Sequence, residues 1–209
     1  MRISLRQLAV LLLLVVLTAT GCSRQPQQTA NTLRYVLEAE PATLDPAKST
    51  AIPESLAELQ LFEGLTRLDA KDRPLPGVAT QWEISADGLR YIFHLRPDAR
   101  WSNGEALTAH DFVYSWRRAL DPETASENSY MLYALKNGQA FNEKEAAPED
   151  VGVRALDERT LEVTLEKPTA YFLSLASFHA FYPVHRASIE KAPESWSSQA
   201  ETLIGNGPF

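Results

Sequence analysis

The stretch TAHDFVYSWRRALDPETAS, residues 108–126, predicts a capped amphipathic helix that stops at Asp121 and Pro122. Thr108 can cap the first turn, and Asp111, three residues later, has the place of a capping-box acid. Apolar side chains recur at helical spacing and predict one buried stripe, made of Phe112, Val113, Trp116, Ala119 and Leu120. These aromatic residues are therefore expected in the core. The opposite side of the helix is expected in solvent and carries Tyr114, Arg117 and Arg118.

β-Hairpins are predicted on both sides of this helix. Residues 82–95 form the first, with a turn at Ala86-Asp87-Gly88, and residues 151–155 pair with 161–165 in the second. Alternating apolar and polar residues predict a further strand at 33–38. Hairpins separated by single helices indicate an α/β (mixed α+β) domain with a mixed sheet.

Shorter helices are expected elsewhere. Pro53 suits the first turn of a helix that ends at Gly64 and carries three apolar residues on one face: Leu56, Leu59 and Phe62. Further helices are predicted at 129–136, after Pro168 and at 187–191.

The first 21 residues have the features of a signal peptide. Arg2 and Arg6 precede an unbroken apolar run at 8–17, which is too short for the roughly 20 residues that cross a bilayer. The following ATGC, 19–22, resembles a bacterial lipobox, which implies lipidation of Cys22 and a membrane anchor. Because Ala19 stands where lipoboxes usually carry Leu, cleavage to a soluble form stays open. Residues 22–31 are expected to be the anchor cysteine and a flexible tether, and residues 32–209 the folded domain.

Charge and cysteine content restrict the function further. The net charge is −7, and loss of Arg2 and Arg6 with the signal peptide changes it to −9, so binding to nucleic acid is not expected. Cys22 is the only cysteine, so no disulfide within the chain is possible in an oxidising compartment. The fold must therefore be held by its core.

The sequence contains none of the common catalytic or metal-binding motifs. Its four histidines lack metal-ligand spacing; His94 is expected to be structural within a strand, and His110 to be solvated at a helix start. We therefore expect no enzyme, no catalytic residue, no metal and no cofactor.

Several stretches, in order along the chain, resemble the oligopeptide-binding branch of the family 5 extracellular solute-binding proteins. They are FEGL (62–65), PGVATQWEIS (76–85), FHLRPDARWSNG (93–104) and the opening stretch. The resemblance runs from residue 33 to residue 209, and DPETAS (121–126) favours the oligopeptide branch over the dipeptide and nickel branches.

This resemblance implies a periplasmic, lipid-anchored receptor that captures oligopeptides between two lobes for an ABC importer. Its partners would be the permease and ATPase subunits, and it would act as a monomer. The chain would supply a truncated first lobe of the periplasmic-binding-protein type, with a small hairpin-and-helix subdomain. GNGPF (205–209) resembles the point where the chain of that lobe returns to its sheet.

The resemblance also implies three ligand-binding residues. Glu54 matches an acid of the family near the cleft, although a carboxylate at a helix start explains it equally well. A ligand-contacting tyrosine of the family aligns with Asn128 without a gap, and with Tyr130 after a shift.

Two other classes of function stay open. One is a receptor for another solute, such as a murein peptide, a dipeptide or a metal chelate. The other is an exported hydrolase whose catalytic residues lie beyond Phe209.

Overall fold

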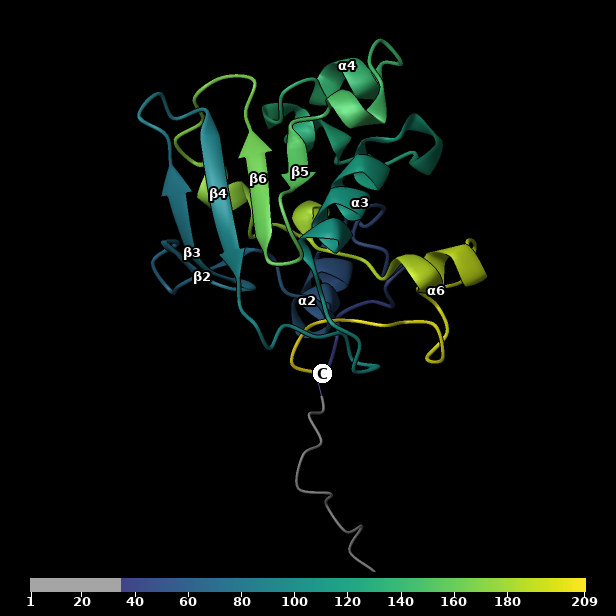
Figure 1. Ribbon diagram of the computed structural model, residues 1–209. Helices are drawn as coiled ribbons and strands as arrows, with labels where there is room; N and C mark the ends of the chain where they lie inside the picture. Colours follow the sequence, from purple (N-terminus) through teal and green to yellow (C-terminus); the bar gives the residue numbers. More distant parts are fainter. Residues whose placement is uncertain (1–34) are drawn as a thin grey trace, which may run out of the picture. The chain divides into compact units, whose positions relative to one another are not determined.

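A four-stranded sheet forms the base on which α3 packs. The computed structural model describes residues 35–209, and in this part of the chain the strands run in the order β3 (Ala79–Ile84), β4 (Arg90–Leu95), β6 (Thr160–Thr164) and β5 (Val153–Ala155) (Figure 1). Both predicted hairpins are confirmed, and Gly88 has the positive φ that the first turn requires. A separate pair joins β1 (Thr66–Leu68) to β2 (Pro74–Pro76).

The combination of sheets and helices confirms the predicted fold class. Every strand pair among residues 35–209 is antiparallel, so the parallel pairs of a mixed sheet are not seen there. After β4 the chain forms the helices that cover the sheet, returns in β5 at the edge and then turns back in β6, which runs antiparallel to both β5 and β4.

Helix α3 (Ala109–Leu120) is the predicted helix, and it packs along β5 and β6 (Figure 1). The capping box is present, because the backbone N–H of Thr108 donates to Asp111 Oδ2 over 2.7 Å. Phe112 and Trp116 are fully buried, and the Trp116 indole N–H donates to the Phe181 carbonyl over 2.8 Å. The core prediction for these aromatic residues is confirmed.

The prediction of a solvated opposite side of α3 was wrong. Arg118 binds the buried Asp45 and is only 12% exposed, while the Arg186 guanidinium lies 5.4 Å from the ring centroid of Tyr114. Residues distant in sequence cover this side, including α6 (Arg186–Lys191). Helical spacing could not indicate their presence.

The remaining helices are short. They are η1 (Pro122–Thr124), η2 (Ser129–Ala134), α4 (Gly138–Asn142), η3 (Pro148–Asp150), α5 (Phe172–Leu175) and η4 (His179–Phe181). The predicted helix at 129–136 is therefore a 3-10 helix, and the one after Pro168 begins at Phe172. Phe172 and Phe181 pack their rings against each other and connect the sheet to α3 through Tyr91 and Trp116.

Helix α2 (Ile52–Leu61) begins as predicted but buries a different side. Its buried residues are Glu54 and Glu58, whereas Ile52 is 75% and Leu59 is 53% exposed. The predicted apolar face is thus not the buried one, although Phe62, just after the helix, is buried. The side of α2 that is covered faces polar groups of a neighbouring loop, so carboxylates occupy it.

The prediction of a strand at 33–38 was wrong for residues 35–38, the part of this stretch that the structure describes. Residues 35–38 are irregular, and none of the strands in the described chain pairs with them. A strand needs a hydrogen-bonded neighbour, which an alternating pattern alone does not provide. The predicted signal peptide, Cys22 and the tether lie outside the described residues.

Candidate functional site

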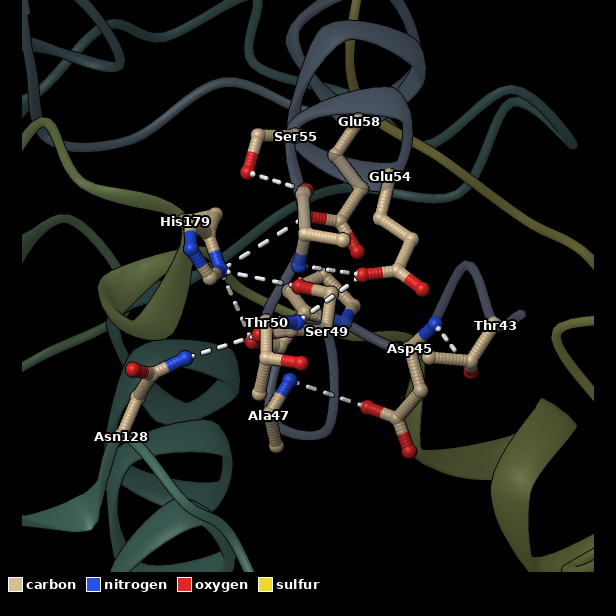
Figure 2. A network of polar contacts seen from close by, with 12 residues as sticks. Thr43, Asp45, Ala47, Ser49, Thr50, Glu54, Ser55, Glu58, Asn128 and His179 are labelled. Carbon is tan, nitrogen blue, oxygen red and sulfur yellow. Dashed lines mark hydrogen bonds and ion pairs between the residues drawn. The ribbon is translucent and has the colours of Figure 1, made fainter. Parts of the chain in front are cut away.

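Residues 42–51 form a loop before α2 whose backbone is held by carboxylates; we call it the acid-anchored loop. Glu54, in the first turn of α2, accepts hydrogen bonds from the backbone N–H groups of Thr50 (2.9 Å) and Ala51 (2.6 Å) (Figure 2). It also accepts the backbone N–H of Ala42 over 3.1 Å. Burial opposes ionisation of Glu54, but these N–H groups outweigh it and hold its pKa below the ordinary value. The charged Glu54 therefore fixes both ends of the loop.

Asp45 ties the same loop to α3. Its two carboxylate oxygens accept hydrogen bonds from the guanidinium of Arg118 over 2.9 and 2.6 Å, and the side chains of Asp45 and Arg118 are 3% and 12% exposed. Asp45 also accepts the backbone N–H of Ala47 over 3.1 Å. A two-pronged contact of this kind fixes orientation as well as distance.

Glu58, one turn after Glu54, contacts the acid-anchored loop from inside the molecule. The Ser49 hydroxyl donates to Glu58 Oε2 over 2.9 Å, and Nδ1 of His179 lies 3.0 Å from that hydroxyl and 3.2 Å from the Pro46 carbonyl oxygen (Figure 2). Because a carbonyl only accepts, His179 carries a proton on Nδ1. Ser49 and Glu58 are fully buried, and His179 is 7% exposed.

These buried groups are neutral at pH 7. Burial raises the pKa of Glu58 to about 8, and the nearby carboxylates of Asp45 and Glu54 act in the same direction, against the hydrogen bond from Ser49. Burial also lowers the pKa of His179, although the Pro46 carbonyl and Glu54 oppose it. Glu58 thus stays protonated where an ordinary glutamate is charged, and Glu58 Oε1 has no hydrogen-bond partner among the described residues.

Two of the three residues that the sequence predicts at the ligand site meet at the acid-anchored loop. Asn128 donates its side-chain amide to the Ser49 carbonyl over 2.8 Å, next to the N–H groups of Thr50 and Ala51 that Glu54 binds (Figure 2). Tyr130 follows Asn128 by two residues and is 58% exposed. Glu54 is 4% exposed and its oxygens receive backbone hydrogens, an arrangement that matches its role at the helix start. Direct contact of these residues with a ligand stays a prediction.

The sequence reasoning did not find Ser49, Glu58 or His179. One signal was present, because Glu54 and Glu58 are one turn apart and must share a face of their helix. Nothing indicated His179, which lies 130 residues from Ser49 along the chain. The predictions for His94 and His110 agree with the structure: His94 lies in β4 with Nε2 3.1 Å from Glu83 Oε1, and His110 is exposed at the start of α3.

A serine, a histidine and a glutamate together resemble a catalytic triad, but their geometry differs from one. In a triad the serine donates to the imidazole, and the acid binds the other ring nitrogen. Here the Ser49 hydroxyl donates to Glu58, and Nδ1 of His179 faces both Ser49 and, at 3.6 Å, Glu58. Within residues 35–209, no group of three or more His, Cys, Asp or Glu side chains is placed to hold a metal ion.

A cavity of about 750 Å³ lies at the other end of α2. Its walls include Leu59, Phe62, Arg67, Tyr182 and Asn206. None of the predicted ligand residues lines this cavity. The candidate site is therefore the acid-anchored loop and not this cavity.

No helix among the described residues has the length and apolar character needed to span a bilayer.

Comparisons with known proteins show the class of binding proteins to which this fold belongs. Residues 73–209 match the profile of "Bacterial extracellular solute-binding proteins, family 5 Middle". The periplasmic oligopeptide-binding protein OppA of Escherichia coli is 44% identical over 81% of this chain and 31% of its own length. The periplasmic murein peptide-binding protein MppA of the same organism is 43% identical over 81% of this chain and 32% of its own length.

Among solved structures, OppA of Listeria monocytogenes bound to peptide superposes with a TM-score of 0.78 and 40% identity, covering 80% of this chain and 33% of that one. The chain belongs to the family 5 extracellular solute-binding proteins. It spans about a third of the length of these relatives.

Proposed function

We propose that this chain is the N-terminal part of a two-lobed receptor that captures oligopeptides outside the inner membrane and delivers them to an ABC importer. The observation that carries the proposal is the agreement in sequence and fold with the oligopeptide-binding relatives over four fifths of the chain. Residues 32–209 would form most of the first lobe, and the second lobe would close over the peptide. Permease and ATPase subunits would be its partners.

Asn128 and Tyr130 are proposed to contact the peptide beside the acid-anchored loop. The amide N–H of Asn128 is directed to Ser49, which leaves its Oδ1 to accept a hydrogen bond from a peptide N–H. The exposed Tyr130 can add apolar contact and a hydroxyl group. Glu54 is included in the proposed site because it shapes the loop next to them; its direct contact with the peptide is part of the same proposal.

The test uses the complete gene product. Peptides that copurify are extracted and identified by mass spectrometry, and tri-alanine is titrated into the stripped protein by calorimetry. We expect a peptide mixture and a saturable heat change; empty protein with no heat would refute the function. Asn128→Ala should weaken affinity about tenfold, the effect of one hydrogen bond of about 1.4 kcal/mol. Tyr171→Ala removes an exposed tyrosine (64%) just before α5 and serves as the control.

Murein peptides are a second candidate ligand, because the murein peptide-binding relative is as similar to this chain as the oligopeptide-binding one. Competition between tri-alanine and a murein tripeptide distinguishes the two. If the murein tripeptide displaces tri-alanine at a hundredfold lower concentration, the receptor is a murein peptide receptor.

We further infer that the protein binds peptides without cleaving them. Ser49 is fully buried and donates to a carboxyl group, so it offers no nucleophile to a ligand. Mass spectrometry of peptides kept with the intact protein should show no new fragments. Appearance of fragments that require the protein would support the hydrolase instead.

The export signal and anchor are part of the same proposal: residues 1–21 would be removed, and Cys22, the first residue of the tether 22–31, would carry lipid. Labelled palmitate should enter the wild type but not Cys22→Ala. Equal labelling of both, or of neither, would remove the anchor from the proposal and leave a soluble periplasmic receptor.

A further inference from the structure

Ser49 joins a buried acid to the candidate ligand site. Its hydroxyl contacts Glu58 and His179 on the inside, and its carbonyl accepts the amide of Asn128 on the other side (Figure 2). A displacement of Ser49 must therefore change both sets of contacts. The proposed function does not itself explain why a protonated glutamate and a neutral histidine lie beneath the loop.

The surroundings of Glu58 are poor in positive charge. The carboxylates of Asp45, in the loop, and Glu54, in α2, both raise the pKa of Glu58. A charge on Glu58 in turn raises the pKa of the buried hydroxyl of Tyr182, which follows η4. Arg118 from α3 is bound to Asp45, and His179 from η4 donates to the Pro46 carbonyl. A negative charge on Glu58 would thus have no unpaired cation beside it in the described part of the chain.

We propose that Glu58, Ser49 and His179 are positioning residues for peptide binding: together they form a neutral latch that holds residues 45–51, and ionisation of Glu58 releases it. The latch rests on the proposed function, since it positions the same site. Release moves the Ser49 carbonyl away from Asn128 and weakens the peptide site. Acidic and neutral surroundings keep the latch closed, and alkaline surroundings open it.

Peptide affinity should fall as the pH rises, because only the protonated, neutral form of Glu58 keeps the latch closed. With a pKa of about 8, Glu58 is almost wholly protonated at pH 6.5 and about one tenth protonated at pH 9. Apparent affinity falls in proportion to the competent fraction, so peptide affinity should drop about tenfold across this interval.

The experiment compares variants of the complete gene product at pH 6.5 and pH 9 by calorimetry with tri-alanine. The amino group of the peptide titrates in the same range, so the readout is the difference between variants. Glu58→Gln keeps the shape and cannot ionise, and its affinity ratio between the two pH values should be about tenfold smaller than that of the wild type. Glu190→Gln changes an exposed glutamate on α6 and should behave as the wild type. Equal ratios in all three proteins would overturn the latch.

Ser49→Ala supplies a second test that does not depend on how well Glu58→Gln folds. Glu58 holds the loop through the Ser49 hydroxyl, so removal of this hydroxyl opens the latch whatever the charge of Glu58. Ser49→Ala should therefore bind tri-alanine more weakly than the wild type at pH 6.5, and its affinity ratio between pH 6.5 and pH 9 should be smaller than that of the wild type; wild-type affinity at pH 6.5, or the wild-type ratio, would contradict the proposal.

Infrared difference spectra separate the latch from the function. At pH 7 the wild type should show a protonated carboxyl band that falls to about one tenth by pH 9 and is absent from Glu58→Gln. If tri-alanine does not bind at any pH, the proposed function fails. If it binds but the band is missing at pH 7, the latch alone fails.

Discussion

Helices α2 and α3 are both amphipathic but bury opposite kinds of side chain. Helix α3 buries Phe112 and Trp116 against the sheet, whereas α2 buries Glu54 and Glu58 and exposes Leu59. The sheet offers an apolar surface, and the acid-anchored loop offers backbone N–H groups and a hydroxyl. The buried face of a helix is thus selected by what it meets, and a carboxylate is stable inside when donors surround it or when it keeps its proton.

The two regions should also respond differently to substitution. Loss of apolar volume beneath α3 should destabilise the protein at every pH. Changes beneath α2 should depend on pH, because the groups concerned are titratable.

The largest expected effect is that of Trp116→Ala. Its ring is fully buried and its indole N–H donates to Phe181, so we expect a loss of about 3–5 kcal/mol in the free energy of unfolding. Urea unfolding followed by circular dichroism measures it. Tyr130→Ala, at a 58% exposed ring, is the control and should change stability by less than about 0.5 kcal/mol. A small effect at Trp116 would remove the contrast between the helices.

Glu58→Gln should show the pH dependence of the buried polar side. The pKa of Glu58 is raised to about 8 in the folded protein, so the folded state binds its proton more tightly than the unfolded chain does. The wild type then loses stability as the pH rises from the unfolded pKa to about 8, by on the order of 4 kcal/mol. The variant lacks this loss. Denaturation at pH 5 and pH 8.5 tests this: an equal difference at both pH values would contradict it.

Arg118→Ala breaks the buried ion pair between α3 and the acid-anchored loop. Removal of one partner leaves Asp45 uncompensated, so we expect a loss of about 3 kcal/mol. Arg186→Ala breaks the pair with Glu190, in which both side chains are more than half exposed, and should cost less than about 1 kcal/mol. Chemical denaturation of both variants provides the measurement. Similar losses of stability in the two variants would mean that burial of the ion pair between Arg118 and Asp45 does not increase its contribution to stability.

The smallest effect on stability is expected at Leu59 of α2, which the sequence analysis predicted on a buried face. Leu59→Gln should change the free energy of unfolding by less than about 0.5 kcal/mol, because Leu59 is 53% exposed and the two residues have similar helix propensity. Leu120→Gln, at a fully buried position of α3, should cost several times more. Thermal unfolding of the two variants measures the difference. A large loss of stability in Leu59→Gln would show that the surface of Leu59 is covered in the complete protein.

Much of the fold could be predicted from local pattern. The capping box at Thr108 and Asp111, both hairpins and the aromatic core of α3 depend on side chains close in sequence, and these predictions were confirmed. Two predictions were wrong: that one side of α3 lies in solvent, and that α2 buries its apolar face. Both failed because residues distant in the chain decide which side of each helix is covered.

The same division holds for the candidate site. Sequence similarity indicated Glu54, Asn128 and Tyr130 singly, and the structure brings Glu54 and Asn128 to one loop. His179 has no recognisable spacing from Ser49 or Glu58, because its contacts join η4 to the loop and to α2 across more than a hundred residues.

The sequence by itself determined where α3 and the two hairpins of the four-stranded sheet lie and the family to which the chain is similar, because periodicity, caps and turns are local properties. Only the tertiary structure decided which faces are buried and which acids are charged. Burial and ionisation depend on the groups that surround a side chain in space, and for Glu54, Glu58 and Asp45 those groups include distant segments of the chain.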